Sequence, residues 1–279
     1  GVGSNRVVPF RKPRIVMLAD EGVRITEYGA AWFTLEQRLG YPFTPMRLGT
    51  LARADLSGVD VVVVPQGSTS TYLSLLGDGG VDRLGEWIRE GGTLVAWGGG
   101  ALELAGEWID AAYAGDDGPS SEEQKAERLA EIDALSESAE PVPPVVSPSA
   151  DPDAPMFVPG SGARGRLDLT HWLTIGFERE ELPVLVRGDR FLELSERGDN
   201  PVVFGEAGGL AMSGFFWPGN SARWLAGTAY VVVEPAGRGQ VILFTHDPNF
   251  RLAWRATSRL FANALLLGPS LGVRDLGRF

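Results

Sequence analysis

The first hundred residues alternate between short apolar runs and longer segments with a helical period. Three runs of mostly aliphatic residues, 14–19, 59–64 and 93–97, are bounded by turn residues and predict strands buried on both faces. Between them, segments 27–39 and 81–88 place apolar side chains on one helical face. Such alternation predicts parallel βαβ units with right-handed crossovers. In these sheets ligands bind beyond the carboxyl ends of the strands.

The pattern changes after Trp108. Residues 115–155 are rich in Asp, Glu, Ser, Ala and Pro, and we expect a long acidic, Pro-rich surface insertion there. Ala229–Glu234 and Gln240–Thr245, separated by the turn 235–239, predict a β-hairpin, and a final helix is predicted over 250–267. Between the insertion and the hairpin, five closely spaced segments predict a β-rich, antiparallel or mixed extension: RGRLDL, LPVLVR, FLELS, PVVFGE and GLAMSGF.

Composition narrows the class of protein. The chain has 279 residues, which suffices for one large α/β domain or two small ones, and 44% of them are hydrophobic. A net charge of -11 without any basic run argues against nucleic acid as a partner, and no apolar run is long enough to span a membrane. The absence of cysteine excludes a disulfide and a cysteine nucleophile. We expect a soluble domain over 14–270, preceded by a linker or cloning remnant (1–13) and followed by a tail (271–279).

Several stretches together resemble the class I glutamine amidotransferase-like fold. The stretches are KPRIVML, DVVVVPQGS, GGTLVAWGG, VPGSGARGRLDLTHWLTIGF, LPVLVRG and, most specifically, LAGTAYVVVEPAGRGQVILFTHDPNFRLAWRATSRLFANALLLGP. The chain is most similar to the amidotransferase-like domain found behind the catalytic domain of some bacterial zinc carboxypeptidases. The resemblance implies an α/β fold with a flavodoxin-like or amidotransferase-like, mostly parallel sheet and helices on both faces.

The resemblance also implies that the catalytic centre is incomplete. Active amidotransferases carry a cysteine on a strained strand-to-helix turn, activated by a histidine and a carboxylate. The corresponding turn here is Gly98-Gly99-Gly100-Ala101, so glutamine hydrolysis by that mechanism is excluded. His246 matches the family histidine, but Asp247-Pro248 stands where active members carry Pro-Glu. We therefore interpret His246 as the relic of a catalyst.

Other candidate residues have a structural alternative beside the functional one. The glycines Gly98–Gly100 could form an anion-binding nest or merely permit a tight turn. Ser68, after a strand, could be a nucleophile or a helix cap. Asp247 could cap the last helix. On that helix, Arg251 and Arg255 could form a solvated face or a fork that binds a carboxylate.

His171 and the aromatic segment around Trp217 are the remaining candidates. His171 is expected to fix a loop, and Trp217 in GFFWPG to belong either to the core or to an exposed binding surface. The zinc carboxypeptidase signature is missing, because Thr174 and Asn249, rather than glutamate, lie three residues after the two histidines. No metal site is predicted in this chain.

Two functional hypotheses follow. In the first, the chain is a non-catalytic accessory domain of a bacterial zinc carboxypeptidase, with zinc expected only in the parent's catalytic domain. Its partner is then that linked domain or a second copy, and export with the parent is left open.

In the second hypothesis, the chain is a small-molecule hydrolase or ligand-binding protein. There His246 acts as general base, assisted by Asp247 or Glu21. A His246 hydrogen-bonded to a carboxylate in a pocket would favour the second hypothesis, and a buried His246 the first.

Overall fold

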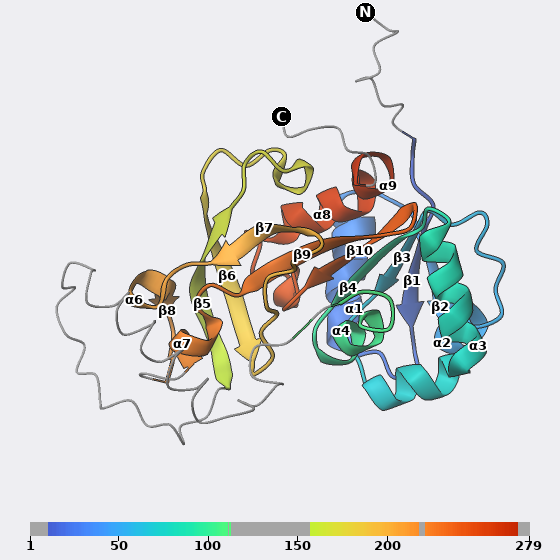
Figure 1. Cartoon of the computed structure of the whole chain (residues 1–279), viewed down its shortest axis with the longest axis horizontal. Helices are drawn as coiled ribbons and strands as arrows, with labels where there is room; N and C mark the ends of the chain where they lie inside the picture. The colour runs from blue at the N-terminus through green and yellow to red at the C-terminus, as the bar shows by residue number, and fades with distance from the viewer. Residues whose placement is uncertain (1–10, 111, 113–156, 218–220, 273–279) are drawn as a thin grey trace, which may run out of the picture.

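The computed structural model describes residues 11–110, 112, 157–217 and 221–272. The described part is a mixed α/β fold on one ten-stranded sheet with strand order β2-β1-β3-β4-β10-β9-β7-β5-β6, in which β8 also pairs with β5 (Figure 1). The strands are β1 Ile15–Ala19, β2 Thr44–Arg47, β3 Val61–Val64, β4 Thr93–Trp97, β5 Val158–Leu167, β6 Glu181–Gly188, β7 Asp199–Phe204, β8 Ala211–Ser213, β9 Ala229–Ala236 and β10 Gly239–Phe244. The acidic insertion expected over 115–155 lies outside the described residues.

The helices are short except for α3. They are α1 Ile25–Trp32 with a π-helical continuation Phe33–Arg38, α2 Leu48–Leu51, α3 Thr69–Arg89, α4 Gly99–Ala105, α6 Ala207–Leu210, α7 Ser221–Leu225, α8 Ser258–Leu266 and α9 Gly268–Leu271, with 3₁₀ turns at Trp172–Thr174 and Phe250–Leu252. The expected helix 81–88 is thus the second half of α3, which is kinked at Gly77, where φ is 60°.

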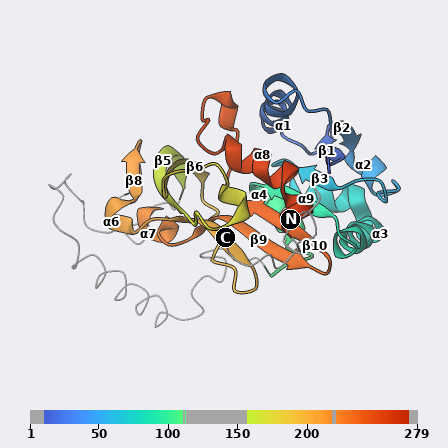
Figure 2. The same cartoon turned by 90° about the horizontal axis from the view of Figure 1, so that it is seen from above.

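One half of the sheet is parallel, as the alternation of apolar runs and helical segments predicts. Strand β1 pairs in parallel with β2 and β3, and β4 pairs in parallel with β3 and β10. All four valines of β3 are buried, because helices cover both faces of the sheet there. Figure 2 shows α1 and α8 on one side of these strands and α2 and α3 on the other.

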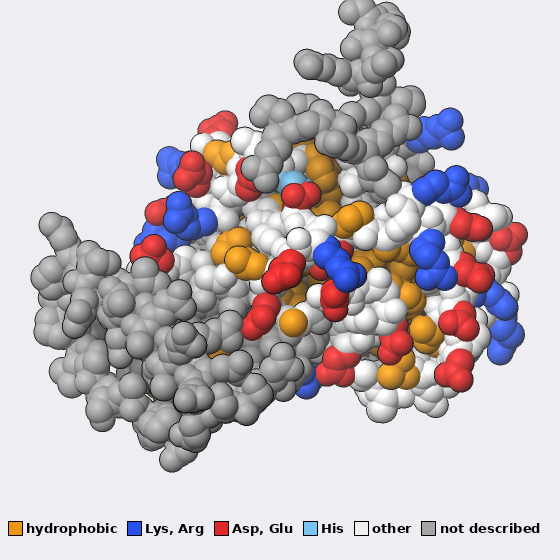
Figure 3. Space-filling view, viewed as in Figure 1, with side chains coloured by type: hydrophobic (Ala, Val, Ile, Leu, Met, Phe, Trp, Pro, Cys, Tyr) orange, Lys and Arg blue, Asp and Glu red, His pale blue; other side chains and the backbone are white. Residues whose placement is uncertain are grey.

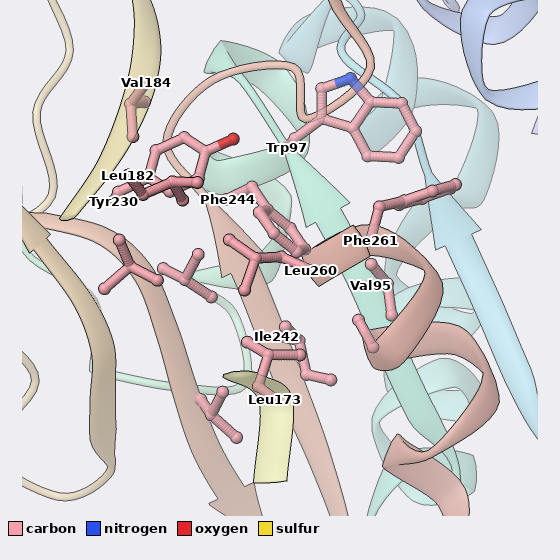
Figure 4. Packing of buried hydrophobic residues seen from close by; sticks show 14 of the residues in the cluster. Val95, Trp97, Leu173, Leu182, Val184, Tyr230, Ile242, Phe244, Leu260 and Phe261 are labelled. Atoms are coloured by element: carbon pink, nitrogen blue, oxygen red, sulfur yellow. The ribbon is translucent and has the colours of Figure 1, made fainter. Parts of the chain in front are cut away.

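Each face of the sheet has its own apolar core. On one face α8 packs on β4 and β10, and Figure 4 shows Phe261 beside Trp97 and Leu260 beside Phe244. The rings of Trp97 and Phe261 meet edge to face, 5.6 Å apart. Full burial of each such side chain stabilises the fold by roughly 1.5–3 kcal/mol. These contacts hold the strand ends of β4 and β10 in place.

The other half of the sheet is antiparallel and confirms the expected β-rich extension. The hairpin β9–β10 is present, but its turn is tighter than expected, with only Gly237 (φ 65°) and Arg238 between the strands. Strands β9, β7, β5 and β6 follow in antiparallel order. The segment FLELS is no strand, because Leu192 makes only an isolated bridge to Ala229.

The last expected helix is wrong in its first half. A 3₁₀ turn, Phe250–Leu252, comes first, and α8 begins only at Ser258. Arg251 has a φ of 48°, in the left-handed region where an α-helix cannot continue. Asp247 is therefore not the cap of an α-helix, as the sequence had suggested. Arg251 and Arg255 do not lie on one helix and so do not form an i, i+4 pair.

Charged side chains of both signs are mixed on the surface. On the face seen in Figure 3, acidic and basic side chains lie next to one another across the described part, with apolar side chains scattered between them. The described residues therefore form no single acidic patch on that face.

Candidate functional site

A pocket of about 370 Å³ opens beyond the carboxyl ends of β3, β4 and β10. This is the edge of the sheet where the parallel order predicts ligands. The pocket is lined by Arg24, Glu27, Gln66, Gly98, Gly99, Glu103, Phe157, Leu185, Arg187, Gly188, Asp189, Arg190, Thr245, His246, Asp247 and Phe250. Four residues singled out in the sequence are among them: Gly98, Gly99, His246 and Asp247. The other candidates lie outside its lining: Glu21, Gly100, Ser68, Arg251 and Trp217.

The turn between β4 and α4 forms one wall of the pocket, and packing requires two of its glycines, Gly98 and Gly100. Gly98 has a φ of 69°, and a Cβ there would lie 2.8 Å from the Gln66 side chain. A Cβ on Gly100 would lie 2.5 Å from the carbonyl oxygen of Gly67. Gln66 thus occupies the space that a side chain at Gly98 would need, whereas a Cβ at Gly99 would have its nearest neighbour 4.0 Å away. Close approach of the two loops is sufficient reason for Gly98 and Gly100, without an anion.

The loop after β3 is fixed by backbone hydrogen bonds. The Ser68 N–H donates to the carbonyl of Gly22 at 2.9 Å, so it is already engaged and is not available to stabilise an oxyanion. The Ser68 side chain is the N-cap of α3 and accepts a hydrogen bond from the Thr71 N–H at 3.4 Å. The geometry matches the cap interpretation of Ser68 rather than the nucleophile interpretation.

His246 follows β10 and is almost completely buried. Only 8% of its surface is exposed, and its Nε2 is shielded from solvent without a hydrogen-bond partner among the described residues. Burial lowers the pKa of His246 to about 3, against the opposing effect of a backbone hydrogen bond with Arg187. The ring packs edge to face against Phe191, with 6.4 Å between centroids. His246 is therefore neutral at physiological pH, and in the described part of the chain no carboxylate is paired with it.

Two buried carboxyl groups, Glu27 and Asp247, meet at the floor of the pocket; we call them the floor pair. Their residues are 6% and 8% exposed. The Trp97 indole N–H donates to Glu27 at 3.2 Å, and the Asn249 backbone N–H donates to Asp247 at 2.8 Å. Burial raises the pKa of Asp247 well above its ordinary value, and the charge and hydrogen bond of Glu27 raise it further. Asp247 therefore holds its proton to a higher pH than an ordinary aspartic acid, and the pair shares that proton through the hydrogen bond between the two side chains.

Two buried tyrosines near the floor pair, Tyr72 and Tyr230, are also kept uncharged. Burial raises the pKa of Tyr72 and of Tyr230, and the nearby carboxylates of Glu27 and Asp247, respectively, add to that effect. Both phenols therefore stay protonated. Neither they nor His246 brings a positive charge to the floor pair, so its remaining negative charge is not balanced from within the floor.

The mouth of the pocket carries several exposed or half-buried charges. Arg190 forms an ion pair with Glu103 at 3.1 Å, and Glu103 also accepts a hydrogen bond from the Thr69 hydroxyl. Arg24 and Arg187 are exposed, and within the described residues neither forms an ion pair; we call them the mouth arginines. Positive charge is thus available at the entrance.

The remaining candidates are dispersed over the surface. Glu21 is exposed and does not approach His246 as its assistant, which corrects that part of the hydrolase hypothesis. Arg251 lies over the Phe250 ring, 5.4 Å from its centroid, and Trp217 lies on the β-rich extension, 36% exposed. The Nδ1 atom of His171 accepts a hydrogen bond from the backbone N–H of a 3₁₀ turn, which agrees with its expected structural role.

Several pocket residues were missed in the sequence. Glu27 had a usable signal, because it lies four residues before Ala31 on the buried side of the first helix, where a carboxylate is unusual. Gln66, Arg24 and Arg187 have no such signal, since only the fold brings their loops together. The described residues hold no group of three His, Asp or Glu side chains suited to a metal ion. Likewise, no helix within them is long and apolar enough to cross a membrane.

No protein-family model matches the chain, and no curated protein sequence matches it. Solved structures show distant likenesses. A cytoplasmic protein from Salmonella typhimurium LT2 aligns with a TM-score of 0.49 at 14% identity over 91% of this chain and 99% of its own. A glutamine amidotransferase from Thermotoga maritima aligns with a TM-score of 0.48 at 8% identity over 84% and 75%.

A β-galactosidase from Bacillus circulans sp. alkalophilus aligns with a TM-score of 0.43 at 14% identity, over 91% of this chain. This chain spans only 31% of that enzyme. All three TM-scores are below 0.5 and all three identities below 25%, so these likenesses assign neither a family nor a function to the chain.

Proposed function

We propose that this chain is a non-catalytic, amidotransferase-like accessory domain that positions a substrate, a partner domain or a second copy for a linked catalytic domain. The single observation that carries the proposal is the state of the site itself. The strand-to-helix turn consists of glycines and carries no nucleophilic side chain, and among the described residues His246 is neutral, shielded and without a carboxylate partner. Nucleophilic catalysis needs a nucleophile within reach of an oriented base, and this arrangement supplies neither.

The identity of the linked catalytic domain rests on the sequence resemblance. That resemblance points to a bacterial zinc carboxypeptidase as the parent, which would hold the zinc ion in its own domain. The incomplete site is consistent with such a role, because an accessory domain needs a stable fold and a binding surface rather than a reactive centre.

A ligand-binding protein is the second candidate function, and the pocket favours it over a hydrolase. About 370 Å³ is within the size range of small-molecule sites, and the lining combines apolar and charged side chains. A hydrolase would need an accessible base. Asp247 carries a proton and His246 Nε2 is shielded, so neither serves as one in this arrangement.

The absence of catalysis is tested with the full chain and its His246→Ala variant. Both are incubated with L-glutamine and with p-nitrophenyl esters, and release of ammonia or nitrophenol is followed. We expect no turnover above the protein-free blank for either protein. Turnover that is present in the full chain and lost in His246→Ala would overturn the proposal.

The accessory role is tested on the native protein from its source. Intact mass and zinc content are measured on the same sample. We expect a mass well above the 29.9 kDa of this chain, with about one zinc per molecule. A native mass near 29.9 kDa without zinc would contradict the accessory role and would leave the ligand-binding candidate.

A further inference from the structure

The pocket separates charge by depth. The floor pair, Glu27 and Asp247, is more than nine-tenths buried and keeps one negative charge that no cation in the floor balances. At the mouth, Arg190 and Glu103 neutralise one another, and the mouth arginines face only one further acid, Asp189. The entrance therefore carries an excess positive charge, and the floor an excess negative charge.

A buried polar atom in the same wall indicates that the pocket is built for an occupant. His246 lines the pocket, is 8% exposed, and has an Nε2 without a partner among the described residues. Buried polar atoms in folded proteins nearly always have a hydrogen-bond partner, and an unpartnered one next to a cavity is a place where a ligand or its water completes the bonding. The orphaned atom and the charge separation are independent observations at one site.

We propose that the pocket binds a small dipolar ligand, whose primary ammonium group is held by the floor pair and whose carboxylate is held by the mouth arginines. The ligand class is that of amino carboxylates with the two groups separated by several bonds. This inference rests on the proposed function, since it assigns a ligand class to a pocket that binds without catalysis.

The physical chemistry of the floor pair gives this binding a measurable signature. An ammonium group donates up to three hydrogen bonds and suits two carboxylates, whereas the resident proton satisfies only one bond between them. When the ammonium group enters, Asp247 releases its proton to solvent and both carboxylates become charged. No bond of the ligand is broken. Because the proton must leave, affinity rises with pH until Asp247 is deprotonated in the free protein.

The carboxylate group of the ligand is inferred from the arginines at the entrance of the pocket. A guanidinium group binds a carboxylate through two parallel N–H donors, and neither of the two exposed arginines forms an ion pair with another described residue. A neutral sugar would use neither charge, and a simple amine or a simple carboxylate would use one of them. A ligand that carries both groups is therefore expected to bind best.

The experiment is isothermal titration calorimetry of the full chain with 4-aminobutyrate, with glycine and 6-aminohexanoate as a length series, and with butylamine, butyrate and glucose as comparisons. We expect a member of the amino carboxylate series to bind at least about ten-fold more tightly than butylamine, butyrate or glucose. Titrations in buffers of different ionisation enthalpy are expected to show release of about one proton per ligand bound.

Variants test the two ends of the ligand separately. Glu27→Gln is expected to weaken binding by roughly ten-fold or more and to abolish proton release, while Glu21→Gln, an exposed acid outside the pocket, leaves both unchanged. Arg187→Gln is expected to weaken binding of the amino carboxylate but not of butylamine, with Arg255→Gln as its matched control. Proton release is measured on the unmodified chain, so the test survives a variant that fails to fold.

The outcomes separate this inference from the proposed function. Lack of binding by the whole series at millimolar concentration, tighter binding of glucose, or binding without proton release overturns the inference and leaves the accessory role intact. The probes are recovered and compared by NMR before and after incubation. A chemically altered probe would instead overturn the non-catalytic assignment.

Discussion

The two walls of the pocket limit its chemistry in different ways. On the glycine wall, Gly98 and Gly100 pack so closely against the loop 66–69 that neither position has room for a side chain, and geometry alone decides what is possible there. On the polar floor, Glu27, Asp247 and His246 are the right residue types for acid–base chemistry, but burial fixes their protonation. The comparison teaches that residue type alone does not decide reactivity, because environment sets what an ionisable group does.

The largest expected effect lies on the glycine wall, at Gly100. Its Cβ would stand 2.5 Å from the Gly67 carbonyl oxygen and 2.6 Å from the Thr69 nitrogen, and backbone atoms cannot swing away. We expect Gly100→Ala to destabilise the fold by about 3 kcal/mol, measured by urea unfolding. Gly99→Ala is the matched control, since its nearest neighbour is 4.0 Å away, and it is expected to change stability by less than about 1 kcal/mol. Equal effects at the two positions would refute the account of this wall.

Gly98 tests whether Gln66 is what closes the turn. Gly98→Ala is expected to cost about 1–3 kcal/mol, through its positive φ and through contact with the Gln66 side chain. Combining it with Gln66→Gly removes the contact but not the backbone strain. A double-mutant cycle is expected to show a favourable coupling of at least about 0.5 kcal/mol. Strict additivity would mean that Gln66 does not close the turn.

Ser68 lies beside the glycine wall and gives a smaller effect. Because Ser68 caps α3, we expect Ser68→Ala to lower the free energy of unfolding by about 1 kcal/mol and to leave ligand binding unchanged. Ser74→Ala, at an exposed position six residues further along the same helix, serves as control and is expected to stay within about 0.5 kcal/mol. A loss of binding with unchanged stability would instead place Ser68 in the site.

On the polar floor, we expect the free energy of unfolding to depend on pH. Asp247 keeps its proton in the folded chain above its ordinary pKa of 3.8, whereas the unfolded chain releases it. The folded state therefore binds more protons, and its free energy of unfolding falls as pH rises above that value. Asp247→Asn keeps an uncharged hydrogen-bonding group and is expected to flatten this fall. If chemical denaturation at several pH values gave the same slope for both proteins, the shared proton would be disproved.

The sequence predicts the parallel half of the fold better than the site. Strands such as β3 and β4 are continuous apolar runs, and their position follows from burial on both faces. The helix expected over 250–267 was wrong in its first half, because Arg251 adopts a left-handed conformation that cannot be predicted from its residue type. The floor pair could not be predicted either, since Glu27 and Asp247 are 220 positions apart in the chain and meet only through the order of the strands.

The central claim, that His246 is a neutral relic shielded inside the fold, is tested most directly by NMR of its ring. The chain has only two histidines, so His246→Gln identifies the signal without further assignment. We expect the His246 ring to show no titration between about pH 8 and about pH 5, because burial lowers its pKa to about 3. A titration with a midpoint near or above the ordinary value of 6.5 would show an accessible, charge-stabilised base and would contradict the account.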